Sequence, residues 1–152
     1  MTNLKKITTY HDEAETQTKE TYFTDEQGLK QGVRKWYDKD GNLGYEENYK
    51  NDKLDGLAAD YYQNGGVKSK ENWKNNKLDG LVTDYYSNKN LKVEADYKDG
   101  KKQGVWNWYY ENSNLKRQEN YKNDKLDGAI TYYNPDGTFN YTENYKDGIK
   151  IN

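Results

Sequence analysis

Apolar and polar residues alternate along this chain in short runs, and turn residues separate the runs about every twelve positions. The alternating residues of one stretch are Leu57, Ala59 and Tyr61, then Val67, Ser69, Glu71 and Trp73, with Gln63-Asn64-Gly65 between the two runs. A period of two is typical of β-strands, whose successive side chains point to opposite faces. The frequent turns leave no uninterrupted helical stripe. The pattern therefore predicts strands joined in pairs as β-hairpins.

The pattern also repeats at a fixed distance. The octapeptide YKNDKLDG occupies residues 49–56 and again 121–128, and WKNNKLDG occupies 73–80. The step from Tyr49 to Trp73 is one period (73 − 49 = 24), and the step from Tyr49 to Tyr121 is three such periods. The closing glycines follow the same period: Gly32, Gly56, Gly80, Gly104 and Gly128. A constant period of this size indicates a stacked-repeat protein, with the octapeptide as the joint between copies.

Six copies fill one predicted domain over residues 1–152. The first, degenerate copy spans residues 5–31, and the regular copies span 32–55, 56–79, 80–103, 104–127 and 128–151. Tyr10 and Tyr22 reveal the first copy, because their separation along the chain is the same as that of Tyr61 and Trp73. This copy is three residues longer than a regular copy. We expect the three additional residues in its joint, residues 23–32.

Positions within a copy are counted from the closing glycine as position 0. Positions 7–9 predict a three-residue loop whose third residue is left-handed, which suits Gly41, Gly65 and Gly137. Lys89 and Ser113 replace this glycine in two copies and predict strained or altered loops. Such a loop is expected to pair position 5 with 11, 3 with 13 and 1 with 15. The predicted fold class is all-β: an elongated antiparallel meander of about twelve strands in one open sheet that can curl.

This pairing predicts two unlike faces. The odd positions carry repeated tyrosines and the aliphatic residues of position 1, and form the predicted packing face. The even positions carry aromatic residues and rows of lysine, which predict a binding surface; a solvated sheet surface is the alternative. The candidate binding residues are Trp36, Tyr62, Tyr86, Trp106, Trp108, Tyr110, Tyr132, Lys50, Lys74, Lys98 and Lys122. A second lysine row at position 12 consists of Lys68, Lys92 and Lys116.

Composition changes the picture of the core. Hydrophobic residues make up 32% of the chain and charged residues 33%, a balance that is typical of disordered proteins. However, the chain has 17 Tyr and 4 Trp, which are too many for a solvated tail. Tyrosine can bury its ring while its hydroxyl stays in water. The composition therefore fits a thin folded sheet without a deep core.

The net charge and the absence of cysteine exclude several kinds of partner and site. The net charge of −2 argues against a general nucleic-acid binder. The absence of cysteine excludes disulfides and thiolate zinc sites, and we expect neither a metal site nor a cofactor. No apolar run is long enough for a transmembrane helix. The start of the chain has no signal-peptide pattern. A chain that begins here in the cell would be cytoplasmic, whereas one that has lost a signal peptide would be secreted or in the envelope.

Candidate catalytic groups are few, and the chain is predicted not to be an enzyme. His11 is the only histidine and lies in the degenerate copy. A glutamate recurs at position 15: Glu20, Glu47, Glu71, Glu119 and Glu143. Because it recurs with the period, we interpret it as structural, accepting a hydrogen bond from a tyrosine or pairing with lysine. The stretch DKDGN at 38–42 has letters of a calcium loop, but Tyr49 stands where that loop needs glutamate.

The unit GLAADYYQNGGVKSKENWKNNKLDG, residues 56–80, resembles the bacterial variant of the MORN repeat. The resemblance covers Gly32 to Gly148 well and residues 5–31 loosely. It implies tandem β-hairpins in an extended sheet and a binding or scaffolding role, and many bacterial members carry an antitoxin label. The eukaryotic type of MORN repeat is linked to membrane phospholipids and protein partners, but its denser glycine pattern is absent here.

Two classes of function remain after these observations. The first is a scaffold that binds a partner protein through the sheet surface, with the antitoxin of a toxin–antitoxin pair as one form of it. The second is binding of lipid headgroups or glycans, with lysine for anions and tryptophan for sugar rings. Self-association through the edges of the sheet is a further expectation.

Overall fold

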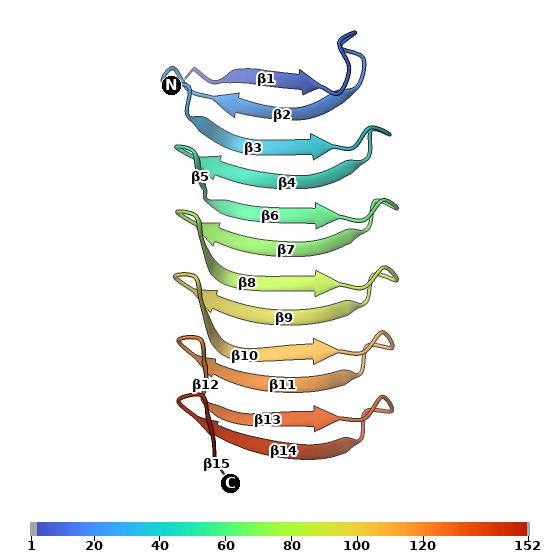
Figure 1. The fold of residues 1–152 in the computed structure, drawn as a ribbon, viewed down its shortest axis with the longest axis vertical. Helices are drawn as coiled ribbons and strands as arrows, with labels where there is room; N and C mark the ends of the chain where they lie inside the picture. Colours follow the sequence, from blue (N-terminus) through green and yellow to red (C-terminus); the bar gives the residue numbers. More distant parts are fainter. Residues whose placement is uncertain (1–2, 152) are drawn as a thin grey trace. The chain divides into compact units, whose positions relative to one another are not determined.

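The computed structural model describes residues 3–151, and every regular element in this range is a β-strand (Figure 1). The chain divides into two compact units, which meet between Lys77 and Leu78. The strands of the first unit are β1 (Lys5–Tyr10), β2 (Thr18–Thr24), β3 (Lys30–Tyr37), β4 (Leu43–Lys50), β5 (Lys53–Leu54), β6 (Gly56–Tyr61) and β7 (Val67–Lys74). Those of the second are β8 (Lys77–Tyr85), β9 (Leu91–Lys98), β10 (Lys101–Tyr109), β11 (Leu115–Lys122), β12 (Lys125–Leu126), β13 (Gly128–Tyr133), β14 (Phe139–Lys146) and β15 (Ile149–Ile151).

The strands follow one another in chain order within each unit. The first unit has the order β1-β2-β3-β4-β6-β7, with β5 paired to β4; the second has β8-β9-β10-β11-β13-β14-β15, with β12 paired to β11. Neighbouring strands are antiparallel. The predicted all-β meander of tandem hairpins is therefore confirmed. Twelve long strands match the predicted number, and the short β5, β12 and β15 belong to the joints.

The three-residue loops have the predicted form. In the copy that starts at Gly56, the Tyr62 N–H donates to the Gly66 carbonyl (2.8 Å), the Gly65 N–H donates to the Tyr62 carbonyl (2.9 Å), and Gly65 has φ 75°. Lys89 and Ser113 adopt the same left-handed conformation, with φ 72° and 70°. Both copies therefore keep the three-residue loop. Each does so with a residue that has a side chain at the left-handed position, where its Cβ is crowded.

We expect Lys89→Gly to stabilise the protein by about 0.5–1 kcal/mol, because glycine relieves the left-handed strain at some entropic cost. Chemical denaturation of the purified protein measures this change. The reverse substitution Gly65→Ala, at the same loop position, is the matched control and should destabilise by a similar amount. A loss of stability in Lys89→Gly would contradict this account of the loop.

The joint between copies is itself a tight two-residue turn. Asn51 and Asp52 have φ 51° and 61°, as the type I′ turn of a two-residue hairpin requires. Asp52 also contacts the preceding joint: its N–H donates to the Lys30 carbonyl (3.1 Å), and its Oδ1 accepts from the Lys30 N–H (2.7 Å). Asp124 makes the same two bonds with Lys102. The repeated polar octapeptide thus forms the turn and ties each joint to its neighbour.

The register of the hairpins differs from the prediction. Tyr61 pairs with Val67, as expected, but Asp60 pairs with Ser69, which joins position 4 to position 13. Position 3 was expected there, so this part of the prediction is wrong. The same one-residue shift occurs at this point in the other regular hairpins. Its cause is a β-bulge: the residue at position 12 has no partner on the first strand.

The bulge changes which residues share a face. Positions 2 and 4 of the first strand lie opposite 15 and 13 of the second, so even positions of one strand share a face with odd positions of the other. In the second unit this face holds a cluster of Val93, Ala95 and Trp106, with Val82, Tyr97, Trp108 and Tyr121 packed around it. The aliphatic residues of position 1 are instead exposed: Val33 36%, Leu57 43%, Leu81 41% and Val105 41%. The predicted packing face is therefore wrong for the first strands, whose even positions face the core, and right for the odd positions 13, 15 and 17 of the second strands.

The first hairpin also departs from its predicted alignment. Lys5 pairs with Thr24 and Tyr10 with Thr18. Thr24 therefore occupies the position in the first hairpin that Trp73 occupies in the copy starting at Gly56, where Tyr22 was expected. The partners Tyr10 and Thr18 are eight positions apart along the chain, whereas Tyr61 and Val67 are six positions apart. Two of the three additional residues therefore lie in the hairpin loop, and one lies in the joint. The regular spacing of Tyr10 and Tyr22 is a coincidence.

Candidate functional site

The second unit contains a cleft of about 220 Å³ at the ends of strands that meet the three-residue loops. It is lined by Tyr86, Lys92, Trp108, Tyr109, Lys116 and Arg117, and we refer to it as the tyrosine–lysine cleft. Its residues come from two consecutive copies, on β9, β10 and β11 and from the residue directly after β8. These strands are adjacent in the second unit (Figure 1).

Tyrosine hydroxyls connect each copy to the next beside this cleft. Tyr86 donates a hydrogen bond from its hydroxyl to the carbonyl of Tyr109 (2.7 Å), and Tyr110 donates to the carbonyl of Tyr133 (3.0 Å). Burial of the ring raises the pKa of Tyr86, and the nearby charge of Glu111 raises it further. Both effects favour the neutral hydroxyl that this bond needs. The Tyr86 ring is therefore held in place as a wall of the cleft.

Trp108 and Arg117 form a cross-strand pair on β10 and β11 that lines the cleft. The Arg117 guanidinium carbon lies 4.9 Å from the centre of the Trp108 ring, which is a cation–π distance. Both side chains contact Glu119: the Trp108 Nε1–H donates to Oε2 (3.0 Å), and Arg117 Nε lies 3.0 Å from Oε1. Tyr121 also donates to Glu119 (3.4 Å). Burial, together with the charge of Glu119, raises the pKa of Tyr121 to about 12.

Two lysines stand over the aromatic rings. Lys92 Nζ lies 5.9 Å from the centre of the Tyr86 ring, and Lys116 Nζ lies 5.5 Å from that of Tyr110. Both are exposed, and neither forms an ion pair within residues 3–151. Both occupy position 12, the residue that each bulge leaves unpaired. The bulges therefore place two uncompensated positive charges, one copy apart, beside a largely aromatic cleft.

The first regular copy shows why the cleft is local. Gly44 takes position 12 there, and the Trp36 ring covers it: a Cβ on Gly44 would lie 2.5 Å from two atoms of that ring. Trp36 stacks on Tyr45 across the hairpin, with ring centres 5.5 Å apart and planes 4° apart. His11 meets the same indole edge-on at 6.3 Å. In this copy the aromatic side chains therefore cover the position from which a lysine projects in the cleft.

The structure places the predicted binding residues in different surroundings. Trp106 is buried, with Tyr97 and Tyr121 ring centres at 5.2 and 5.1 Å, and is a core residue. Tyr132 stacks on Tyr141 at 4.4 Å, and Tyr62 is half-buried after β6. The lysines of position 18 precede the joints, at the opposite ends of the strands from the cleft: Lys50, Lys74, Lys98 and Lys122. Of the predicted set, only Tyr86 and Trp108 line the cleft.

Arg117 and Tyr109 were missed by the sequence reasoning. Position 13 is occupied by Tyr45, Ser69, Val93, Arg117 and Tyr141 in successive copies. No other regular copy has a charged residue in this column, whereas the column of Trp108 also contains Trp36 and Tyr132. This irregularity was the available signal for Arg117. Tyr109 belongs to a tyrosine column that every regular copy has, so no local signal distinguished it.

The repeated glutamates have the structural role that was predicted for them. Glu47 accepts from the Tyr49 hydroxyl (3.0 Å), Glu71 from Trp73 Nε1 (2.9 Å), and Glu143 from Tyr145 (3.1 Å) while pairing with a lysine. Glu20 pairs with Arg34 instead, at 2.7 Å. Among residues 3–151, no three histidine, aspartate or glutamate side chains are grouped so that they could hold a metal ion.

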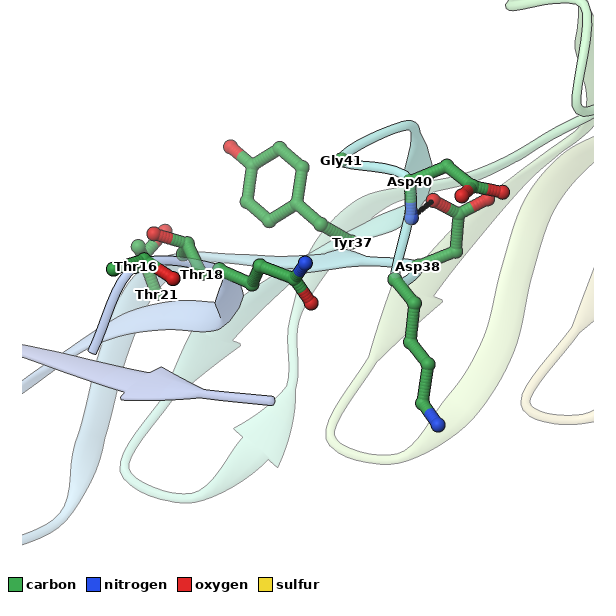
Figure 2. Close-up of a pocket in the computed structure, with 9 residues that line it drawn as sticks. Thr16, Thr18, Thr21, Tyr37, Asp38, Asp40 and Gly41 are labelled. Atoms are coloured by element: carbon green, nitrogen blue, oxygen red, sulfur yellow. Dashed lines mark hydrogen bonds between the residues drawn. The ribbon is translucent and has the colours of Figure 1, made fainter. Parts of the chain in front are cut away.

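A second hollow lies in the first unit, between the loop of the first hairpin and that of the next (Figure 2). Its volume is about 530 Å³, and its lining is polar. The lining residues are Thr16, Gln17, Thr18, Thr21, Tyr37, Asp38, Lys39, Asp40 and Gly41. None of them belongs to the predicted binding set.

Tandem hairpins, bulges and joints at a constant period define a β-sheet repeat scaffold. The family model of the MORN repeat variant matches four segments: residues 30–51, 54–75, 78–99 and 102–123. Together these segments make up more than half of the chain. The chain belongs to the MORN repeat variant family. No curated protein matches it. In the described part of the chain, no helix has the length and apolar character needed to cross a membrane.

Proposed function

We propose that this chain is a non-catalytic scaffold that binds a partner protein, and that an acidic segment of the partner occupies the tyrosine–lysine cleft. The observation that carries the proposal is the pair Lys92 and Lys116, which lack ion-pair partners in residues 3–151 and flank an aromatic hollow. A carboxylate between the two ammonium groups would accept charge-assisted hydrogen bonds from both. An adjacent apolar side chain would displace water from the rings of Tyr86 and Trp108.

The departure of the cleft from the repeat supports a binding role. Packing requirements of a repeat recur with its period, so a charged residue found in one copy alone calls for a local explanation. Arg117 is the one charged residue in its column, where the other regular copies have Tyr45, Ser69, Val93 and Tyr141; the column of Trp108 also contains Trp36 and Tyr132. Tryptophan, tyrosine and arginine are also the residues that concentrate binding energy in protein interfaces. A requirement specific to the copy that starts at Gly104 explains Arg117 better than a requirement of the sheet.

The non-catalytic part of the proposal rests on how the reactive side chains are used. His11 donates from Nε2 to the carbonyl of Tyr37 (2.8 Å) and lies in the other unit from the cleft. Glu119, next to the cleft, is buried and hydrogen-bonded to Trp108 and Tyr121. The proposal includes the antitoxin role that the family resemblance implies, in which the acidic partner is a toxin. A small toxin-like reading frame beside the gene would support that identity.

The test uses the full chain and a short fluorescent peptide in which two aspartates flank a phenylalanine. We expect the peptide to bind, and Lys92→Gln with Lys116→Gln to weaken binding at least about tenfold, with a smaller dependence on salt. Fluorescence anisotropy measures the affinity. Lys98→Gln with Lys122→Gln is the matched control, because these exposed lysines lie on β9 and β11 at the ends away from the cleft. It should change the affinity by less than about twofold.

Three outcomes would contradict the proposal. In the first, a matched peptide with asparagines in place of the aspartates binds equally well. In the second, the control pair weakens binding as much as the cleft pair. In the third, vesicles of phosphatidylcholine and phosphatidylserine bind through Lys92 and Lys116 while the peptide does not, which would assign the cleft to lipid headgroups.

A further inference from the structure

The hollow in the first unit is built by a loop that the other hairpins lack. Residues 11–17 join β1 to β2, and Asp12 holds this loop closed by accepting from the N–H groups of Thr16 (3.0 Å) and Gln17 (3.1 Å) and from the Thr16 hydroxyl. His11 connects the loop to the next hairpin through its bond to the Tyr37 carbonyl (2.8 Å). Hydrogen bonds therefore hold this wall of the hollow in place and join it to the next hairpin.

The opposite wall is the three-residue loop after β3. Asp38 is used by this loop: its Oδ1 accepts from the N–H groups of Asp40 and Asn42, both at 2.9 Å. The hydrogen bond from the Asn42 side chain, with these backbone bonds, lowers the pKa of Asp38. The Asp40 carboxylate, by contrast, accepts no hydrogen bond from any group of residues 3–151. One of the two aspartates is thus structural, and the other is available to a ligand.

Several side chains around the hollow have unused hydrogen-bonding capacity. In the described part of the chain, the side chains of Gln17, Thr18, Thr21 and Tyr37 make no hydrogen bond. Figure 2 shows the threonines gathered at one side of the hollow, with the Tyr37 ring between them and the loop of Asp38 to Gly41. Hydroxyl and amide groups both donate and accept. The hollow therefore presents mixed donors and acceptors around one aromatic ring.

We infer that this hollow is a binding site for a neutral carbohydrate of one or two sugar units. Sugar hydroxyls both donate and accept, which matches Gln17, Thr18, Thr21 and the acceptor carboxylate of Asp40. The C–H face of a sugar ring can pack on the Tyr37 ring. The volume of about 530 Å³ lies within the usual range of ligand sites. Asp38 and Asp40 outweigh Lys39 in charge, which disfavours an anionic ligand. This inference is independent of the tyrosine–lysine cleft.

The experiment exposes the full chain to glucose, galactose, mannose, maltose, cellobiose and lactose, with glucuronate as the anionic counterpart. Saturation-transfer NMR detects binding, and titration of backbone amide signals maps it. We expect at least one neutral sugar to bind with a Kd on the order of 1 mM. The largest shifts should occur in residues 16–18 and 38–41. Thr18→Val with Thr21→Val, which removes two hydroxyls at nearly constant shape, should weaken binding at least about tenfold.

The matched control is Thr131→Val with Thr142→Val, a cross-strand threonine pair in the second unit. It should leave the sugar affinity within about twofold, because neither threonine lines the hollow. The inference is overturned if no neutral sugar binds, if glucuronate binds as tightly, or if the control variant loses as much affinity. Should the Thr18 and Thr21 variant fail to fold by circular dichroism, the map on the unaltered protein decides: shifts confined to other residues overturn the inference.

Discussion

Replacing Trp106 with alanine should destabilise the protein by about 3–5 kcal/mol, the usual cost of deleting a large buried aromatic side chain. Trp106 is 5% exposed and packs against Val93 and Ala95 in the core of the second unit. Its Nε1–H donates to the Asp96 carbonyl (3.1 Å), which would lose this donor. Urea denaturation followed by circular dichroism measures the loss.

The neighbouring residue is the natural control for this prediction. Val105 is 41% exposed on the opposite face, so Val105→Ala should change the stability by no more than about 0.5 kcal/mol. The pair also tests the hairpin register, because without the bulge Val105 would face the core and Trp106 the solvent. A larger loss for Val105→Ala than for Trp106→Ala would refute the register described above.

Glu119→Ala should destabilise the second unit by about 3 kcal/mol, because it removes a buried carboxylate and leaves the half-buried groups that bond to it without a partner. Glu119 is 5% exposed, and three side chains depend on it: Trp108, Arg117 and Tyr121. Alanine would leave the indole N–H and the tyrosine hydroxyl without an acceptor, and the guanidinium without its carboxylate. Thermal and urea denaturation measure the effect.

Two other substitutions separate the possible causes of this loss. Glu119→Gln keeps an acceptor at nearly the same shape, so it should cost clearly less than alanine. Glu143→Ala removes the glutamate at the same position of the last copy, whose partners Tyr145 and Lys150 lie nearer the solvent. Its effect should be smaller still. Equal losses for the two alanine variants would mean that the burial of Glu119 has no energetic consequence.

The hairpins and their turns were predictable because local chemistry determines them. Gly41, Gly65 and Gly137 stand where each loop needs a left-handed residue, and all three adopt it. The period of the repeat could be recognised from the spacing of the closing glycines alone. Even the strain at Lys89 and Ser113 followed from the missing glycine. These features depend on a few neighbouring residues, so a single sequence contains the information.

The faces of the sheet were not predictable in the same way. A bulge of one residue exchanges the faces of a strand, and both parities of this chain carry aromatic residues. Tyr61 at an odd position and Trp106 at an even one both satisfied an alternating pattern. The exposure of Leu57 and Leu81, opposite to expectation, and the burial of Trp106 distinguish the two registers. Burial is a property of the paired strands, and alternation along one strand does not determine it.

The candidate site shows the same limit. The sequence indicated aromatic residues with rows of lysine, and Tyr86 and Trp108 do lie together. It did not indicate which of the two lysine rows lies beside these aromatic residues. The two rows lie at opposite ends of the strands. Lys92 and Lys116 are at the loop end, and Lys98 and Lys122 at the joint end. The bulge then determines that position 12 projects beside the cleft.

The identical joints at residues 49–56 and 121–128 have a consequence for the gene. Recombination between the two segments would delete three whole copies, because the joints are three periods apart, and would leave about half of the chain. Tyr49 would then continue into the residues that now follow Tyr121, with every turn and bulge still in phase. The shortened product would keep intact hairpins but lose residues 86–117 and with them the whole tyrosine–lysine cleft. Unequal crossing-over can therefore remove the tyrosine–lysine cleft and leave the repeat scaffold in a single event.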